Sequence, residues 1–100
     1  MALEITGNIE LDNGLTLSSM YGRVEPLLST SGNIVFTNVN YWVSHNDYLQ
    51  GKSQLSYYLL LKDNFNYDRT TDGSDLLAFS SEKIKEELEA KGFSVQITEL

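Results

Sequence analysis

Few side chains in this chain could carry out chemistry, and the clearest candidate is its only histidine, His45. Ser44 precedes it and Asp47 follows it, so a nucleophile, a base and a carboxylate lie close together in the sequence. Nucleophilic hydrolysis needs three such side chains in one hydrogen-bonded series, which neighbours on a single helical turn rarely form. The chain also lacks the G-x-S-x-G motif of a nucleophile elbow. We therefore predict that His45 lies at the surface of a turn and that the protein is not an enzyme, with no catalytic residue.

A second candidate is the acidic segment 68–73, which reads D-R-T-T-D-G and matches the opening of a calcium-binding EF-hand loop. Such a loop ends on a glutamate at its twelfth position, where this chain has Phe79. We predict instead that Asp72–Ser74 turn the chain and cap a helix. Cysteine ligands are impossible because the chain has no cysteine. We expect no cofactor and no metal, with a weak divalent-cation site among four aspartates as the alternative: Asp63, Asp68, Asp72 and Asp75.

Charge and hydropathy narrow the range of partners. The chain has 14 acidic and 7 basic residues, for a net charge of −7, and the basic residues are scattered along it. Nucleic-acid binding depends on clustered lysine and arginine, so we expect no direct nucleic-acid partner. The N-terminus lacks the basic start and apolar core of a signal peptide, and the longest apolar stretch, Tyr57–Leu61, is too short to span a bilayer. We expect no membrane partner and assembly in a cytoplasm.

The elements that must position these residues begin with a hairpin. Apolar residues between Leu3 and Leu11 alternate with polar ones, which is the pattern of a half-buried strand. Asp12–Gly14 then turns the chain into a second strand that starts at Leu15. Gly7 within the first strand indicates a bulge or a close backbone approach.

The apolar residues of the second strand shift from odd positions, Leu15 and Leu17, to even ones from Met20 onward, so we predict a bulge or break near Ser18-Ser19. Pro26 limits this strand or puts it on a sheet edge. Further elements follow from alternation, helical periodicity and capping residues. They are a loop at Ser29–Asn33, a strand at Ile34–Val43, a helical turn at Ser44–Gly51, a strand at Gln54–Lys62 that continues at most to Tyr67, a helix at Ser74–Lys91 and a strand at Phe93–Thr98.

This order predicts the fold class. We expect a single domain over residues 1–100, α+β and β-dominated, with about five mostly antiparallel strands forming a small sandwich or sheet. One helix in the C-terminal half packs on it. Residue Ser44 is the expected N-cap of the short helical turn and Gly51 its terminator.

Two strands in the middle of the chain are apolar on both faces, which a chain of 100 residues has little material to cover. The aromatic residues there suit core and cross-strand pairing, but some are also candidates for an intermolecular interface. A sugar-stacking platform is the competing interpretation. The first strand is a second candidate, because it could pair within its own sheet or add to a neighbour's edge. The candidate interface residues are Trp42, Tyr58, Leu60, Leu3 and Ile5.

Three motifs carry a family resemblance: the turn Leu11-Asp12-Asn13-Gly14-Leu15, the strand Tyr21-x-Arg23-Val24 and the turn Asp47–Lys52, followed by a C-terminal helix. Together they resemble small virion structural proteins of tailed bacteriophages. The resemblance implies a β-rich, non-enzymatic subunit of the virion, as a capsid auxiliary, head-tail connector or tail protein. Its implied partners are other virion proteins and copies of itself. The alternative is a small β-rich binding module that recognises carbohydrate or a host-surface ligand through an aromatic face.

Overall fold

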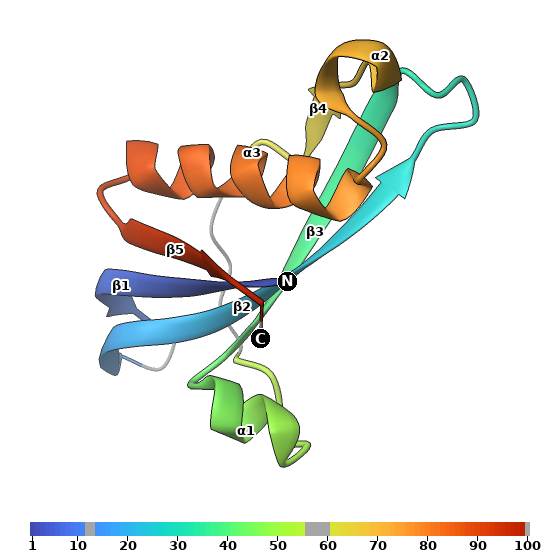
Figure 1. Cartoon of the computed structure of the whole chain (residues 1–100). Helices are drawn as coiled ribbons and strands as arrows, with labels where there is room; N and C mark the ends of the chain where they lie inside the picture. Colours follow the sequence, from blue (N-terminus) through green and yellow to red (C-terminus); the bar gives the residue numbers. More distant parts are fainter. Residues whose placement is uncertain (12–13, 56–60, 100) are drawn as a thin grey trace.

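The fold is built on one antiparallel sheet of five strands, in the order β4-β3-β2-β1-β5. It is seen in a computed structural model that describes residues 1–11, 14–55 and 61–99 (Figure 1). The predicted α+β, β-dominated class is confirmed. The strands are β1 (Ala2–Glu10), β2 (Thr16–Leu28), β3 (Ile34–Trp42), β4 (Asn64–Asn66) and β5 (Ser94–Thr98), and the helices are α1 (His45–Leu49), α2 (Arg69–Asp72) and α3 (Leu76–Ala90).

The first hairpin contains the predicted irregularity. β1 and β2 pair in one register as far as Thr6 and Ser19, and in a shifted register from Ile9 and Leu17. Between these two pairs, Gly7 and Asn8 of β1 lie opposite the single residue Ser18 of β2. The extra residue is therefore in β1, opposite the predicted Ser18-Ser19 break. Beyond the bulge, the Leu11 N–H donates to the Leu15 carbonyl at 2.8 Å. The turn residues 12–13 lie outside the described part of the chain.

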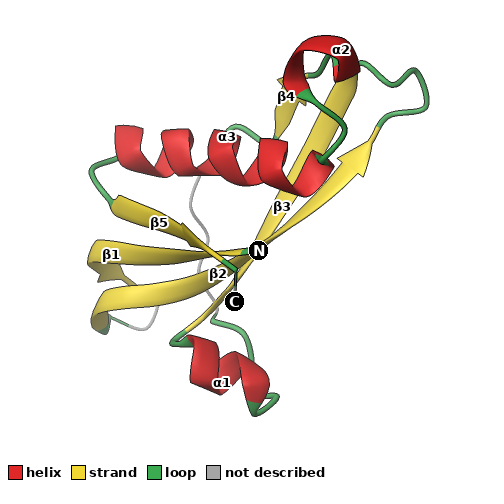
Figure 2. Ribbon diagram, in the orientation of Figure 1, coloured by secondary structure: helices red, strands yellow, loops and turns green. Residues whose placement is uncertain are grey.

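Helix α3 covers one face of the sheet (Figure 2). We call this the inner face. β1 is an interior strand between β2 and β5, and its Leu3 and Ile5 are fully buried with Ile84 and Leu88 of α3. Asp75, whose side chain accepts the Ala78 N–H, is the N-cap of α3, so the predicted cap at Asp72–Ser74 was placed one residue or more too early. The buried residues of this core are Leu3, Ile5, Ile9, Met20, Val24, Tyr41, Phe65, Ile84, Leu88 and Val95.

Strand β2 is longer than its neighbour on one side. β1 pairs with β2 only over residues 16–22, whereas β3 pairs with it over residues 21–28. The second half of β2 therefore has a strand partner only in β3, among the described residues. Pro26 lies in this half, opposite Thr37, so of the two predicted alternatives the edge position is the one observed, and the strand continues past Pro26 to Leu28. The β2–β3 hairpin extends away from β1 and β5 as an arm (Figure 1).

The predicted strand at Gln54–Lys62 is wrong at both of its described ends, while residues 56–60 lie outside the description. Gln54, Leu55, Leu61 and Lys62 are not in a strand, and the strand that follows is β4 at Asn64–Asn66. The apolar residues have another role here, because Leu55 and Leu61 pack against the core from irregular backbone. Hydrogen bonds to β3 fix this path at both ends, from the Leu55 N–H to the Tyr41 carbonyl and from the Thr37 N–H to the Asp63 carbonyl, each at 2.8 Å.

Candidate functional site

The outer face of the sheet, opposite α3, carries the candidate interaction residues. The short helix α1 packs on this face at one end of β3, as predicted for a single helical turn. Its expected N-cap is confirmed, because Ser44 Oγ accepts the Asp47 N–H at 3.1 Å. Gly51 ends the turn with φ 71°, a conformation that favours glycine.

An aromatic cluster joins α1 to the sheet, and we define it as Tyr21, Trp42, His45 and Tyr48. The Tyr48 ring lies 4.8 Å from the Trp42 ring at an interplanar angle of 72°, and 5.5 Å from the Tyr21 ring. His45 lies against Tyr21 with ring centroids 5.1 Å apart. Tyr21 is fully buried and Trp42 is only 9% exposed. These edge and tilted contacts are the favourable geometries for aromatic pairs, so the cluster stabilises the docking of α1.

Arg23 completes this cluster from the neighbouring position on β2. Its guanidinium carbon lies 4.6 Å from the centroid of the Tyr48 ring, within range of a cation–π interaction. The same guanidinium donates a hydrogen bond to the Tyr21 hydroxyl at 2.7 Å. The Arg23 guanidinium therefore contacts both tyrosines of the cluster, Tyr21 and Tyr48, and holds their rings in place.

The local geometry leaves Ser44 in a structural role. Its hydroxyl oxygen accepts the Asp47 backbone N–H, so the side chain is engaged in capping α1. His45 is partly exposed, and its ring is tilted against Tyr21 and stacked on Tyr48.

The acidic segment that follows residue 67 is also occupied in capping. Asp68 is the N-cap of α2 and accepts hydrogen bonds from the Thr70 hydroxyl at 2.7 Å and the Thr70 N–H at 3.0 Å. These bonds favour the charged carboxylate, the one from the Thr70 hydroxyl most strongly, and they lower the pKa of Asp68 below its ordinary value of 3.8. Within the described residues, no group of three or more acidic or histidine side chains could hold a metal ion.

Two of the predicted interface residues are in the wrong place for that role. Leu3 and Ile5 are fully buried beneath α3, and β1 pairs with β2 on one side and β5 on the other. The first strand therefore pairs within its own sheet, which resolves the alternative left open by the sequence. Trp42 belongs mainly to the aromatic cluster, with little surface left for a partner. Tyr58 and Leu60 lie outside the described residues.

The outer face instead exposes an apolar pair that the sequence prediction missed. Leu27 on β2 lies directly opposite Phe36 on β3, near the end of the arm. Their side chains are 69% and 45% exposed. The alternation of side chains along the strands could have revealed this exposure. Leu27 points to the same face as Glu25, and Phe36 to the same face as Asn38. Both residues therefore continue a polar, solvent-facing row.

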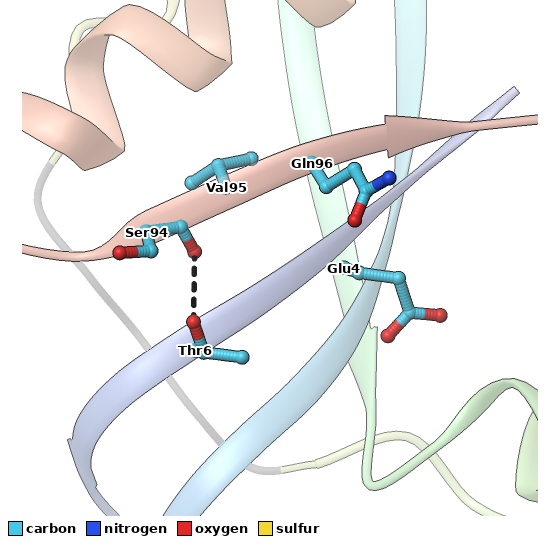
Figure 3. Close-up of a pocket in the computed structure, with 5 residues that line it drawn as sticks. All are labelled: Glu4, Thr6, Ser94, Val95 and Gln96. Atoms are coloured by element: carbon cyan, nitrogen blue, oxygen red, sulfur yellow. Dashed lines mark hydrogen bonds between the residues drawn. The ribbon is translucent and has the colours of Figure 1, made fainter.

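A shallow depression lies elsewhere on the outer face, between β1 and β5 (Figure 3). Its volume is about 180 Å³. One weak hydrogen bond crosses it, from the Thr6 hydroxyl to the Ser94 carbonyl at 3.5 Å. Glu4 is its one ionisable side chain, so its lining offers a single charged group with no second carboxylate or base beside it. The lining residues are Glu4, Thr6, Ser94, Val95 and Gln96.

Comparisons of the chain with protein-family models, with curated proteins and with solved structures found no match. None of the helices in the described ranges is long and apolar enough to cross a membrane.

Proposed function

We propose that this chain is a non-enzymatic structural subunit of a tailed-bacteriophage virion that acts through contacts with other virion proteins. The observation that supports this proposal is the exposed pair of Leu27 and Phe36 on the projecting β2–β3 arm. The proposal also rests on the resemblance of three turn and strand motifs to such proteins.

The arm is suited to reach a neighbouring subunit. Eight residues of β2, from Tyr21 to Leu28, pair in unbroken register with β3, so the backbone holds the pair of side chains in a fixed position. Complete burial of an exposed leucine or phenylalanine side chain stabilises a contact by roughly 1.5–3 kcal/mol. Aromatic residues are enriched in such contacts. A partner that covers Leu27 and Phe36 would therefore gain useful binding energy from two side chains.

Net charge fits the same role. At −7 the free subunits repel one another at long range, which favours solubility before assembly. The apolar pair then supplies a short-range contact that acts only when a complementary surface meets the arm.

Recognition of carbohydrate through an aromatic face is the second candidate, and the described rings favour it less. A stacking platform needs open, roughly coplanar rings. Trp42 and Tyr48 instead meet at 72°, and Trp42 is almost completely buried. We therefore rank a structural role first.

Incorporation into particles tests the proposal. A phage whose genome encodes this chain, beside genes for portal, capsid or tail proteins, would be complemented with the wild type or with the double variant Leu27→Ser/Phe36→Ser. A second double variant, Leu15→Ser/Leu49→Ser, is the matched control, because those leucines are also exposed, at 62% and 65%, but lie off the arm.

We expect immunogold labelling and mass spectrometry of purified particles to find the wild type and the control variant. The arm variant should be depleted at least about fivefold, since two apolar side chains contribute to the contact. Absence of the wild-type chain from purified particles would refute a virion role. Equal incorporation of the arm variant would refute the role of Leu27 and Phe36.

A further inference from the structure

We infer that two copies of this chain associate through the free edge of β5, with the two β5 strands antiparallel in one continuous sheet. This inference goes beyond the proposed function and does not depend on it. Its basis is the end position of β5 in the sheet, where β1 is its only strand partner among the described residues. A regular strand in that position presents backbone N–H and C=O groups along its other side.

The residues of β5 themselves, all of which the structure describes, carry none of the features that normally block pairing at a strand edge. Natural sheets prevent unwanted pairing with lysine, proline, bulges or very short edge strands. Ser94–Thr98 contains no charged residue and no proline, and its five residues pair with β1 without a register shift. Its valine, isoleucine and threonine also have high β-propensity. The strand is therefore competent to pair along its outer side.

The other edges of the sheet do carry such features. β4 is only three residues long, and charged Lys62 and Asp63 precede it. The half of β2 that pairs with β3 but not with β1 contains Pro26, which has no N–H to donate. The contrast singles out β5 as the edge on which another strand can add.

The sequence of β5 favours a second copy as the occupant, because the strand is self-complementary. An antiparallel pair centred on Gln96 brings all five residues into register: Gln96 meets its own copy, Ser94 meets Thr98, and Val95 meets Ile97. Outer residues then stay on the outer face, and Val95 and Ile97 stay on the inner face. Ile97 is only partly buried in the single subunit, so the apolar pairs would extend the core across the seam.

Charge does not oppose this pairing, despite the net charge of −7 on each copy. No charged residue lies within the paired strands. The nearest acidic residue in sequence is Glu99, and in this register it lies opposite the second copy's Phe93 rather than another carboxylate. Long-range repulsion between copies is screened beyond about 8 Å at physiological salt.

Sedimentation velocity tests the inference across the low- to high-micromolar range, with the double variant Ser94→Lys/Gln96→Lys. In the proposed register the new lysine at position 96 would face its own copy, and like charges directly opposite each other on paired strands are destabilising. Glu4 pairs with position 96 within the subunit, so the variant should fold normally. The matched control is Asn64→Lys/Asn66→Lys, which adds the same charge to two exposed positions on β4.

We expect the wild type and the control to form a reversible dimer and the β5 variant to dimerise at least roughly fivefold more weakly. Thermal unfolding of the dilute variants checks that they fold. Hydrogen exchange supplies a second readout, since amides of β5 in the wild type should gain protection as concentration rises.

A wild type that stays monomeric throughout this range would overturn the inference. A β5 variant that dimerises as tightly as the control would also overturn it, by assigning the contact to another surface. Neither result bears on incorporation into particles, so this inference and the proposed function fail separately.

Discussion

Gly7 lies against Phe93, so close that a Cβ atom at position 7 would stand 2.8 Å from Phe93 Cδ1. The bulge of β1 and the entry to β5 meet at this contact. Gly7 also has φ 152°, a conformation that other residues rarely adopt. The glycine is therefore required twice, by its own backbone and by its neighbour across the sheet.

Replacement of Gly7 by alanine should lower the free energy of unfolding by about 2–4 kcal/mol, through backbone strain and the clash with Phe93. Gly32→Ala is the matched control, because Gly32 has φ 77° but a Cβ atom added there would meet no other atom within 4 Å. It should cost only the strain, about 1–2 kcal/mol. Urea denaturation measures both, and an equal loss in the two variants would contradict the role of Phe93.

Ile9 tests whether the first strand is part of the core. It is fully buried, so Ile9→Ala should reduce the free energy of unfolding by roughly 2–5 kcal/mol. Leu27→Ala is the control, because an exposed position should change stability by about 0.5 kcal/mol or less. A loss below about 0.5 kcal/mol for Ile9→Ala, in the same denaturant experiment, would mean that β1 is not packed in solution.

Trp42 reports on the aromatic cluster, as the only tryptophan in the chain. Because it is 9% exposed, its emission should be blue-shifted, poorly quenched by iodide and unchanged by added glycans. Tyr48→Ala should shift the emission to the red, since the Tyr48 ring contacts Trp42. Leu49→Ala, on the exposed side of the same helix, should leave it unchanged. A glycan-dependent shift of the wild type would favour the carbohydrate-binding alternative.

Asp68 should make one acid-sensitive contribution to stability. Its folded pKa lies below the ordinary 3.8, so the contribution is complete above pH 3.8 and is lost as pH falls through the folded value. NMR titration of the carboxyl carbon measures the shift. Thr70→Ala should raise the pKa toward 3.8, because the Thr70 hydroxyl is the main cause of the shift. Thr71→Ala should have a smaller effect, and the reverse order would contradict this account.

Local patterns in the sequence predicted much of the fold. Alternation from Leu3 to Leu11 identified β1, and helical periodicity identified α3. The shift of the apolar residues of β2 from odd to even positions indicated a bulge between β1 and β2. These features depend on residues within a few positions of one another. The N-cap of α3 was misplaced because Ser74 and Asp75 are both good caps, and only the path of the backbone distinguishes them.

The interaction surface was harder to predict because it depends on which face α3 covers. Leu3 and Ile5 were assigned to an interface because nothing local in the sequence indicates that β5 completes the sheet beside β1. Thr6 and Ser94, which face each other across these two strands, are 88 residues apart. Leu27 and Phe36 were missed for the opposite reason. Apolar residues in a strand suggest a core, but Leu27 and Phe36 lie on the outer face of the sheet, which α3 does not cover.

The pairing of β1 with β5 also has a consequence for the order of folding. The β2–β3 hairpin closes a loop of five residues, whereas β5 must find β1 from the far end of the chain. Closure of the longer loop costs more chain entropy and gains its contacts only when it is complete, so β5 should join the sheet late. The edge proposed for association therefore exists only in a subunit that has finished folding.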